Sequence, residues 1–241
     1  MNIALIFAGG TGSRMKSTGR PKQFLELHGK PIIIHTLEHF ENHPEIDAIC
    51  VVCIAEWIDY LKKLLDRYLI RKVRWIVPGG ASGQLSIFNG VDAVYNTSDI
   101  PKDSTMLVHD GVRPLINDKL ISDCISMVAE CGNAITVAPA IETVVIKNKD
   151  EHVESILDRS MCSLARAPQC FVLSDLFSAH IQAQKDHIEN FIDSANLMNH
   201  YGHKLNIVEG PSENIKITTP LDFYVFRAIY EARENTQIYG L

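Results

Sequence analysis

Short runs of apolar, largely β-branched residues alternate with amphipathic segments along the first 140 residues of the chain. The apolar runs predict strands over residues 2–7, 48–54, 73–77, 105–109 and 134–139. Apolar residues that recur every three or four positions predict helices over residues 32–42, 56–68, 84–95 and 118–131. Because strands and helices alternate, we expect an α/β fold with a mostly parallel sheet flanked by helices.

The pattern changes between about residues 142 and 171. Two short β-branched runs, 143–147 and 153–157, are separated by polar residues 148–151, which predicts a β-hairpin. Further along the chain we expect helices over 173–185, 194–201 and 220–233, and a strand over 204–209. No internal repeat or low-complexity linker divides the chain. We therefore predict a single domain, residues 1–241, with an inserted β-arm at about 142–171.

A glycine-rich turn directly follows the first predicted strand. Gly9, Gly10 and Gly12 let the backbone approach a polyphosphate closely and supply amide donors. Ligands of open parallel sheets bind beyond the carboxyl ends of the strands, which is where this turn lies. The turn lacks the lysine of a Walker loop and the third glycine of the dinucleotide fingerprint. A tight connection between strand and helix is the structural alternative.

Cations gather beside this turn. Arg14 lies within it, and Arg20 and Lys22 follow a few residues later. Several cations close to one glycine-rich turn repel one another unless an anion joins them. The turn and its cations together predict a site for phosphate groups.

Composition and charge narrow the range of partners. The chain is 46% hydrophobic and 22% charged, which suits a folded core. Its net charge of −6 argues against a protein that binds nucleic acid by bulk attraction, yet leaves room for a local phosphate pocket. No apolar run approaches the roughly 18 residues of a membrane span, and no basic leader opens the chain. We therefore expect no membrane partner and a cytoplasmic location.

Cys50 and Cys53 have the spacing of a metal-binding pair. They fall within a predicted buried strand, where residues three apart point to opposite faces. We therefore expect buried, reduced thiols here instead of a shared metal.

Five spaced motifs carry a family resemblance. They are Gly-x-Gly-x-Arg-Met ending at Met15 with Pro21-Lys-Gln23, Gly79-Gly80 with Ser86, Val108-His-Asp-Gly-Val-Arg-Pro114, Asp158-Arg159 with Pro168-Gln169, and Asn214-Ile-Lys-Ile-Thr218. From about residue 2 to 230 the chain resembles the CDP-alcohol-forming cytidylyltransferases. These comprise 2-C-methyl-D-erythritol 4-phosphate cytidylyltransferase and D-ribitol-5-phosphate cytidylyltransferase. The resemblance implies a Rossmann-like, three-layer nucleotidyltransferase fold and transfer of CMP from CTP to one of these two polyol phosphates.

The same resemblance implies a role for each matching residue. The catalytic set is Arg14, Lys22, Asp110, Arg159 and Lys216. The nucleotide-binding set is Phe7, Ala8, Gly9, Gly10, Gly12, Gly79, Gly80, Gln84 and Ser86. The acceptor-binding set is Asp110, Arg113, Arg159 and Lys216. Asp110 would also hold Mg²⁺, a hard cation that binds one or two carboxylates plus phosphates. A homodimer, in which the arm of one chain completes the acceptor site of the other, is implied as well.

Three motif residues have plainer alternatives. Ser86 could cap the helix in which it lies. Arg113 could form a structural ion pair with Asp110. For His109 we favour a structural histidine over a catalytic base.

The chain departs from the family pattern mainly near the acceptor. The departing positions are Gly83 in place of arginine, Glu142 in place of aspartate, Ala167 and Ile192 in place of threonine, and the unexpected cation Arg166. With Gly83 in place of the arginine, a nucleotide contact is either lost or moved to Gln84. Since the transfer core is retained, we hypothesise an active enzyme whose acceptor differs from methylerythritol phosphate. The alternatives are a nucleotidyltransferase with another nucleotide or a sugar phosphate, and a catalytically silent nucleotide-binding homologue.

Overall fold

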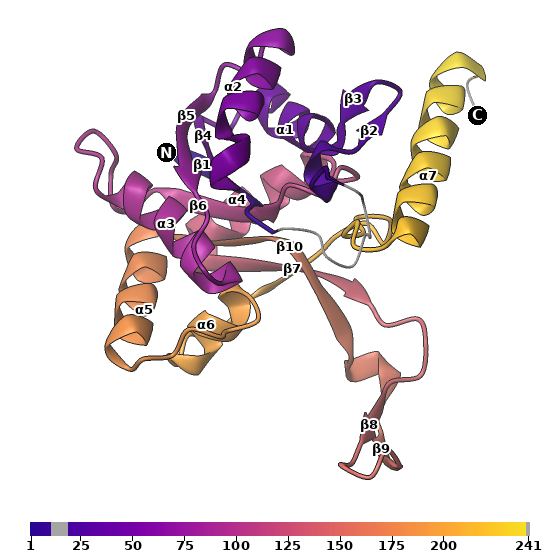
Figure 1. The fold of residues 1–241 in the computed structure, drawn as a ribbon. Helices are drawn as coiled ribbons and strands as arrows, with labels where there is room; N and C mark the ends of the chain where they lie inside the picture. The colour runs from indigo at the N-terminus through magenta and orange to yellow at the C-terminus, as the bar shows by residue number, and fades with distance from the viewer. Residues whose placement is uncertain (11–18, 240–241) are drawn as a thin grey trace.

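A seven-stranded sheet forms the centre of the computed structural model, which describes residues 1–10 and 19–239 (Figure 1). In spatial order its strands are β11 (Ile207–Glu209), β7 (Asn133–Pro139), β10 (Ser163–Val172), β6 (Thr105–Asp110), β1 (Asn2–Ala8), β4 (Ala48–Cys53) and β5 (Val73–Pro78). Every neighbouring pair is parallel except the two that involve β10. The sheet is therefore mostly parallel, as predicted.

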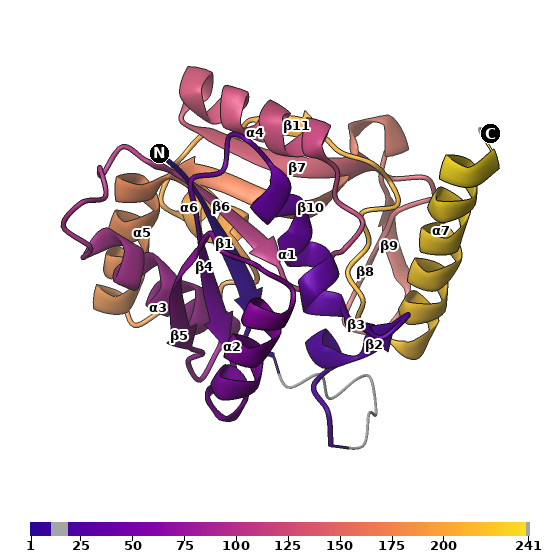
Figure 2. The same cartoon turned by 90° about the horizontal axis from the view of Figure 1, so that it is seen from above.

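Helices cover both faces of this sheet (Figures 1 and 2). One face packs against α1 (Ile32–Asn42), α2 (Ile58–Arg67) and α4 (Asp118–Cys131). The other face packs against α3 (Gly83–Tyr95), α5 (Leu173–Lys185) and α6 (Ser194–His200). The alternation of β1 divides the two cores, because Ile3 and Leu5 face one and Ala4 and Ile6 the other. This is the three-layer α/β arrangement that the sequence predicts.

A small hairpin, two 3-10 helices and the C-terminal helix lie outside the two helical layers. The hairpin of β2 (Glu26–Leu27) and β3 (Lys30–Pro31) follows the 3-10 helix η2 (Lys22–Phe24). The long helix α7 (Pro220–Tyr239) buries Phe226 against Leu27 and Ile32 in a third apolar cluster. A further 3-10 helix, η3 (Ala55–Trp57), leads into α2.

The arm begins with a hairpin of β8 (Val145–Lys147) and β9 (Val153–Ile156), which extends away from the body of the molecule (Figure 1). The 3-10 helix η4 (Arg159–Met161) leads back into β10. The sequence did not predict β10, because Arg166 and Pro168 interrupt its apolar run. The strand accommodates them where its pairing with β7 shifts, between Ala165 and Gln169.

Cys50 and Cys53 lie on opposite faces of β4, as predicted. Cys50 is buried in the core beneath α3, and Cys53 in the core beneath α1 and α2. Burial raises the pKa of Cys50 to about 12 and that of Cys53 to about 11. Both side chains are therefore neutral thiols that pack as small apolar groups.

Close packing of α3 on the sheet requires a glycine at position 90. A β-carbon there would lie 2.7 Å from Leu5 Cδ1 and 2.8 Å from Val52 Cγ2. We expect Gly90→Ala to lower the free energy of unfolding by about 1–3 kcal/mol through overpacking. Urea unfolding measures this. Gly83→Ala is the matched control in the same helix, because no atom other than its chain neighbours and the backbone of its own helix lies within 4 Å of its β-carbon position. Equal stability of the two variants would contradict the packing argument.

Candidate active site

The ends of β1 and β6 bring the glycine-rich turn beside the central aspartate. Phe7 and Asp110 are register partners in these adjacent parallel strands, and Gly111 N donates to Phe7 O at 2.8 Å. Gly9 and Gly10 follow β1 at this carboxyl edge of the sheet, where the sequence predicts the site. Gly12 and Arg14 lie outside the described residues.

Asp110 accepts hydrogen bonds from two cations. Arg113 Nε lies 2.7 Å from Asp110 Oδ2, and Lys216 Nζ lies 2.6 Å from Asp110 Oδ1. Arg113 also donates through Nη1 to Asn214 O at 2.9 Å. The ion-pair alternative for Arg113 is thus realised in the structure, and it joins the Asp110 motif to the Asn214–Thr218 motif.

Asp110 is ionised in this setting. Burial opposes its ionisation, but the charges and hydrogen bonds of Lys216 and Arg113 hold its pKa well below the usual range. One carboxylate thus faces two cations, which leaves one net positive charge at the carboxyl edge of the sheet. Such an arrangement attracts an anionic ligand while it keeps the two cations fixed.

Lys22 is held at the same edge by its neighbour in η2. Gln23 is buried, and its Nε2 donates to Ala8 O at 2.6 Å, which ties η2 to the end of β1. Lys22 Nζ donates to Ile217 O at 3.1 Å. The side chain of Lys22 therefore lies next to the segment that carries Lys216, so two predicted catalytic lysines come from distant parts of the chain to one place.

A second glycine turn, Gly79–Gly80, packs against the first. A β-carbon on Gly9 would lie 3.6 Å from Gly79 Cα, and one on Gly80 would lie 2.8 Å from Leu85 Cβ. Ser86 is buried, and its Oγ accepts from Gly80 N at 2.9 Å and donates to Ser82 O at 2.7 Å. The hydroxyl of Ser86 therefore fixes the shape of the second turn.

The capping alternative for Ser86 is wrong. The N-cap of α3 is Ser82, whose side chain accepts from Leu85 N at 3.1 Å. Ser86 lies one turn further into the helix, where its hydroxyl faces the Gly79–Gly80 turn instead of the free amides of the helix end.

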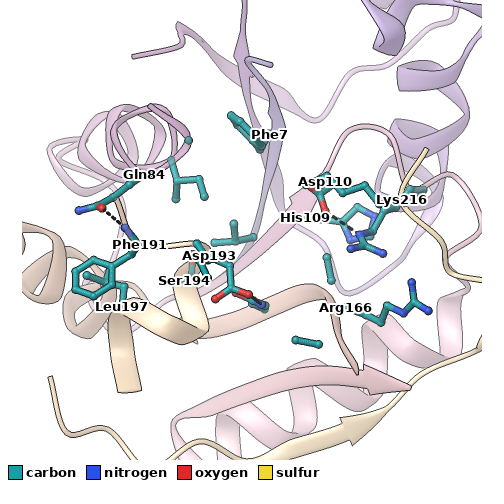
Figure 3. A pocket seen from close by; sticks show the side chains of 18 of the residues that line it. Phe7, Gln84, His109, Asp110, Arg166, Phe191, Asp193, Ser194, Leu197 and Lys216 are labelled. Atoms are coloured by element: carbon teal, nitrogen blue, oxygen red, sulfur yellow. Dashed lines mark hydrogen bonds and ion pairs between the residues drawn. The ribbon is translucent and has the colours of Figure 1, made fainter. Parts of the chain in front are cut away.

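A pocket of about 250 Å³ opens between the carboxyl edge of the sheet, α3, α5 and α6 (Figure 3). Its lining residues are Phe7, Gly83, Gln84, Ile87, Val108, His109, Asp110, Arg113, Ala165, Arg166, Ala167, Gln169, His180, Phe191, Ile192, Asp193, Ser194, Leu197 and Lys216. The predicted site residues Phe7, Gln84, Asp110, Arg113 and Lys216 are thus brought together. Figure 3 shows Asp110, Lys216 and Arg166 at one end, and Gln84 and Phe191 at the other.

Gln84 shapes the far end of this pocket. Its Nε2 donates to Ile188 O at 2.7 Å, and its Oε1 accepts from Phe191 N at 2.9 Å. Both ends of the amide group thus hold the loop that precedes α6. The structure therefore gives Gln84 a positioning role beside its predicted contact with nucleotide.

Arg159 is the predicted site residue that lies apart. It belongs to η4 in the arm, does not line the pocket of its own chain, and donates through Nη1 to Ile141 O at 3.0 Å. The structure therefore does not bring Arg159 and Lys216 together within one chain.

The positions that depart from the family pattern gather in the pocket. Gly83, Arg166, Ala167 and Ile192 all line it, whereas Glu142 does not. Four departing positions from distant parts of the sequence thus line one cavity.

Sequence reasoning did not assign functions to several lining residues. Gln169 Nε2 donates to Asp193 Oδ2 at 3.0 Å, and Asp193 caps α6 by accepting from Asn196 N. The sequence signal for this contact is the Asp193–Ser194 pair directly before an apolar helix, which is typical of a helix N-cap. His180 comes from α5, and nothing in its local sequence marks it as a pocket residue.

His109 is buried beneath the pocket, and burial lowers its pKa to about 3. Its Nε2 lies 3.1 Å from Arg113 O. The ring is therefore neutral at physiological pH and holds the backbone of the loop after Asp110. This geometry favours the structural interpretation of His109.

The buried histidines are expected to make stability depend on pH. Burial lowers the pKa of His35 and His180 to about 4, as it does for His109 to about 3. The unfolded chain binds protons first, so the free energy of unfolding falls as pH drops below about 6.5, by up to about 1.4 kcal/mol per pH unit for each histidine. Urea unfolding between pH 7.5 and 5 measures the slope. His35→Phe should reduce the slope of unfolding free energy against pH by the contribution of one histidine. An unchanged slope would show that His35 does not contribute to the pH dependence.

None of the helices in residues 1–10 and 19–239 combines the length and apolar character needed to cross a lipid bilayer.

The chain is similar over nearly its whole length to known cytidylyltransferases. The family model described as 2-C-methyl-D-erythritol 4-phosphate cytidylyltransferase matches residues 2–232. A ribitol-5-phosphate cytidylyltransferase of Vibrio parahaemolyticus is 51% identical over 240 residues and 100% of each chain. A 2-C-methyl-D-erythritol 4-phosphate cytidylyltransferase of Clostridium acetobutylicum is 36% identical over 93% of this chain and 95% of that protein. The crystal structure of a 4-diphosphocytidyl-2C-methyl-D-erythritol synthase from Anaerococcus prevotii has a TM-score of 0.81, with 26% identity over 95% of each chain.

Proposed function

The chain belongs to the 2-C-methyl-D-erythritol 4-phosphate cytidylyltransferase family, and we propose that this member transfers CMP from CTP to D-ribitol 5-phosphate. The products are CDP-ribitol and pyrophosphate. The observation that carries this acceptor is the difference in identity between relatives: 51% to a ribitol-5-phosphate enzyme against 36% to a methylerythritol-phosphate enzyme. The departures from the family pattern that line the pocket support it as well.

In the proposed reaction, an oxygen of the acceptor phosphate forms a bond to the α-phosphorus of CTP. The bond from that phosphorus to the bridging oxygen breaks, and pyrophosphate leaves with the electron pair. Transfer of this kind depends on alignment and on stabilisation of negative charge. Lys22 beside the glycine-rich turn supplies such charge, together with Arg14 as the family motif implies.

The nucleotide is proposed to lie over the two glycine turns. Backbone groups of Ala8, Gly9 and Gly10 hold its phosphates, and the Gly79–Gly80 turn, shaped by Ser86, holds its ribose and base. The close packing of the turns supports one continuous binding surface. The acceptor then occupies the pocket, with its phosphate near Lys216 and Arg113.

Asp110 is proposed as a protein ligand of Mg²⁺. It is ionised, and its two oxygens keep lone pairs beyond those that Arg113 and Lys216 use. A single carboxylate suits an ion that keeps several waters and binds the phosphates of its substrate. When bound, Mg²⁺ would neutralise negative charge on the phosphates of the substrates.

A homodimer is proposed, with the arm at the contact between subunits. The arm carries a group of exposed apolar side chains: Ile141, Val145, Ile146, Val153, Ile156, Leu157, Met161 and Leu164. An exposed apolar surface of this kind is typical of a protein interface. Arg159 lies at the base of the same arm and outside its own pocket, which supports a role in the acceptor site of the neighbouring chain.

The proposed compartment is the cytoplasm. All six cysteines are free thiols, which suits a reducing environment.

Pyrophosphate release with CTP and a panel of alcohol phosphates tests the function. The panel contains D-ribitol 5-phosphate, 2-C-methyl-D-erythritol 4-phosphate and glycerol 3-phosphate. We expect kcat/KM to be about 100-fold higher for the ribitol compound than for the others, because unpaired polar groups of the site reject poorly matched acceptors. Turnover with methylerythritol phosphate alone would contradict the proposed acceptor. Binding of CTP without turnover of any acceptor would favour a silent homologue.

A further inference from the structure

Arg166 is a cation of the pocket that has no role in the family motifs. It lies on β10, and its side chain is only half-buried, yet its Nε atom is fully enclosed and has no hydrogen-bond partner in the structure. No carboxylate among the described residues forms an ion pair with it. Figure 3 shows Arg166 at the same end of the pocket as Lys216 and Asp110. An enclosed donor without a partner costs free energy that a bound acceptor atom recovers.

The charge around Arg166 points to an anionic ligand. Asp110 carries one negative charge against the two positive charges of Arg113 and Lys216. Arg166 adds a further positive charge, and no carboxylate among the described residues pairs with it. Burial and the charge of Arg113 lower the pKa of Arg166, although a guanidinium stays protonated in proteins. Asp193, the other lining carboxylate, is engaged by Gln169 and by the start of α6. The three cations Arg113, Lys216 and Arg166 less the one carboxylate Asp110 leave about two positive charges at this end, while Asp193 keeps its own charge farther along the pocket (Figure 3), so the cationic end suits a phosphate group.

Ser194 presents a second group without a partner. It is the first residue of α6, is buried, and its Oγ has no hydrogen bond in the structure. Figure 3 places Ser194 beside Asp193, between the cationic end and the Gln84 end of the pocket. A hydroxyl group both donates and accepts hydrogen bonds, as does each hydroxyl of a polyol. An acceptor bound by its phosphate at the cationic end would extend its carbon chain past this position.

We propose that Arg166 and Ser194 are specificity-determining residues of the acceptor site. Arg166 binds the phosphate of the alcohol phosphate as a donor additional to Lys216 and Arg113. Ser194 forms a hydrogen bond with a hydroxyl of the polyol chain. This inference rests on the proposed function, since it assigns the residues that would recognise its acceptor. Arg166 suits the task because its planar donors match phosphate oxygens.

Steady-state kinetics of single variants test the inference. Arg166→Gln should raise KM for D-ribitol 5-phosphate about 10- to 100-fold, because a charge-assisted hydrogen bond is lost. The KM for CTP, and CTP affinity by calorimetry, should stay unchanged. Arg166→Lys should recover part of the loss, since it retains the charge without the fork of donors. Ser194→Ala should raise KM for the acceptor about 3- to 10-fold, as expected for a neutral hydrogen bond.

Matched controls separate binding from folding. Arg71→Gln and Ser178→Ala remove the same side-chain types at exposed positions outside the pocket, and should leave both KM values unchanged. Melting temperatures monitor the fold of every variant, and acceptor binding by calorimetry is measured alongside turnover. Wild-type turnover with unchanged acceptor KM in Arg166→Gln overturns this inference alone. Wild-type protein that neither binds nor turns over any alcohol phosphate of the panel overturns the proposed function, and this inference with it.

Discussion

Replacing Lys22 by alanine is expected to lower kcat about 100- to 1,000-fold, on the scale of one lost donor to a developing anion. The reason is the position of its ammonium group, which donates to Ile217 O beside Lys216 and close to the glycine-rich turn. In the proposed reaction, the charge of Lys22 would stabilise the transition state of the transfer more strongly than it stabilises bound CTP. We therefore expect KM for CTP to change little. Single-turnover measurement of pyrophosphate release reports the chemical step directly.

Lys62→Ala is the control for the Lys22 variant. Lys62 is an exposed lysine that pairs with Asp59 on α2, away from the pocket. It should keep wild-type kcat. Lys22→Ala protein that is folded, binds CTP and turns over at the wild-type rate would contradict the transition-state role of Lys22.

The second large effect concerns stability. Asp110→Ala is expected to lower the free energy of unfolding by about 3–5 kcal/mol, because it leaves the buried guanidinium of Arg113 without its counter-charge. Urea unfolding at pH 7 measures the loss. Adding Arg113→Met to this variant removes the uncompensated charge and should recover part of the stability. No recovery in the double variant would contradict the electrostatic explanation. Asp123→Ala, which breaks an exposed pair with Lys119, should cost at most about 1 kcal/mol.

Acid unfolding gives an independent measure of Asp110. Its pKa in the folded protein lies below the unfolded value, so its contribution to stability is complete above about pH 4 and is lost as pH falls further. Asp110→Asn should therefore have a shallower loss of stability below pH 4 than the wild type. The histidine contribution begins near pH 6.5, so the interval between about pH 6.5 and 4 reports the histidines before Asp110 starts to titrate.

Local pattern was sufficient to predict most elements of this fold. The bounds of α1, α4 and α5 agree with the sequence prediction because each helix has a continuous apolar face that begins and ends within its own residues. The strand β10 was missed because its stability comes from pairing with β6 and β7 on both sides, which local sequence does not record. Interior strands rarely contain proline, so Pro168 weighed against it.

Site residues that belong to a sequence motif were predicted. Residues whose role depends on contacts between distant parts of the chain were predicted less well. The spacing of Asp110 and Arg113 is local, so their ion pair was among the predicted alternatives. The distinction between Ser82 and Ser86 was not available from sequence, because both serines lie near the start of α3. The unpartnered donors of Arg166 and Ser194 arise from burial by other elements, and burial depends on the complete fold.

The antiparallel course of β10 has a consequence for how this enzyme can evolve. Because β10 runs against its neighbours, its first half, with Ala165, Arg166 and Ala167, reaches the edge where the parallel strands end. The residues proposed to bind the nucleotide come instead from the turns after β1 and β5. If the proposed sites are right, mutations in β10 are expected to change the acceptor pocket and to leave the proposed CTP-binding turns in place.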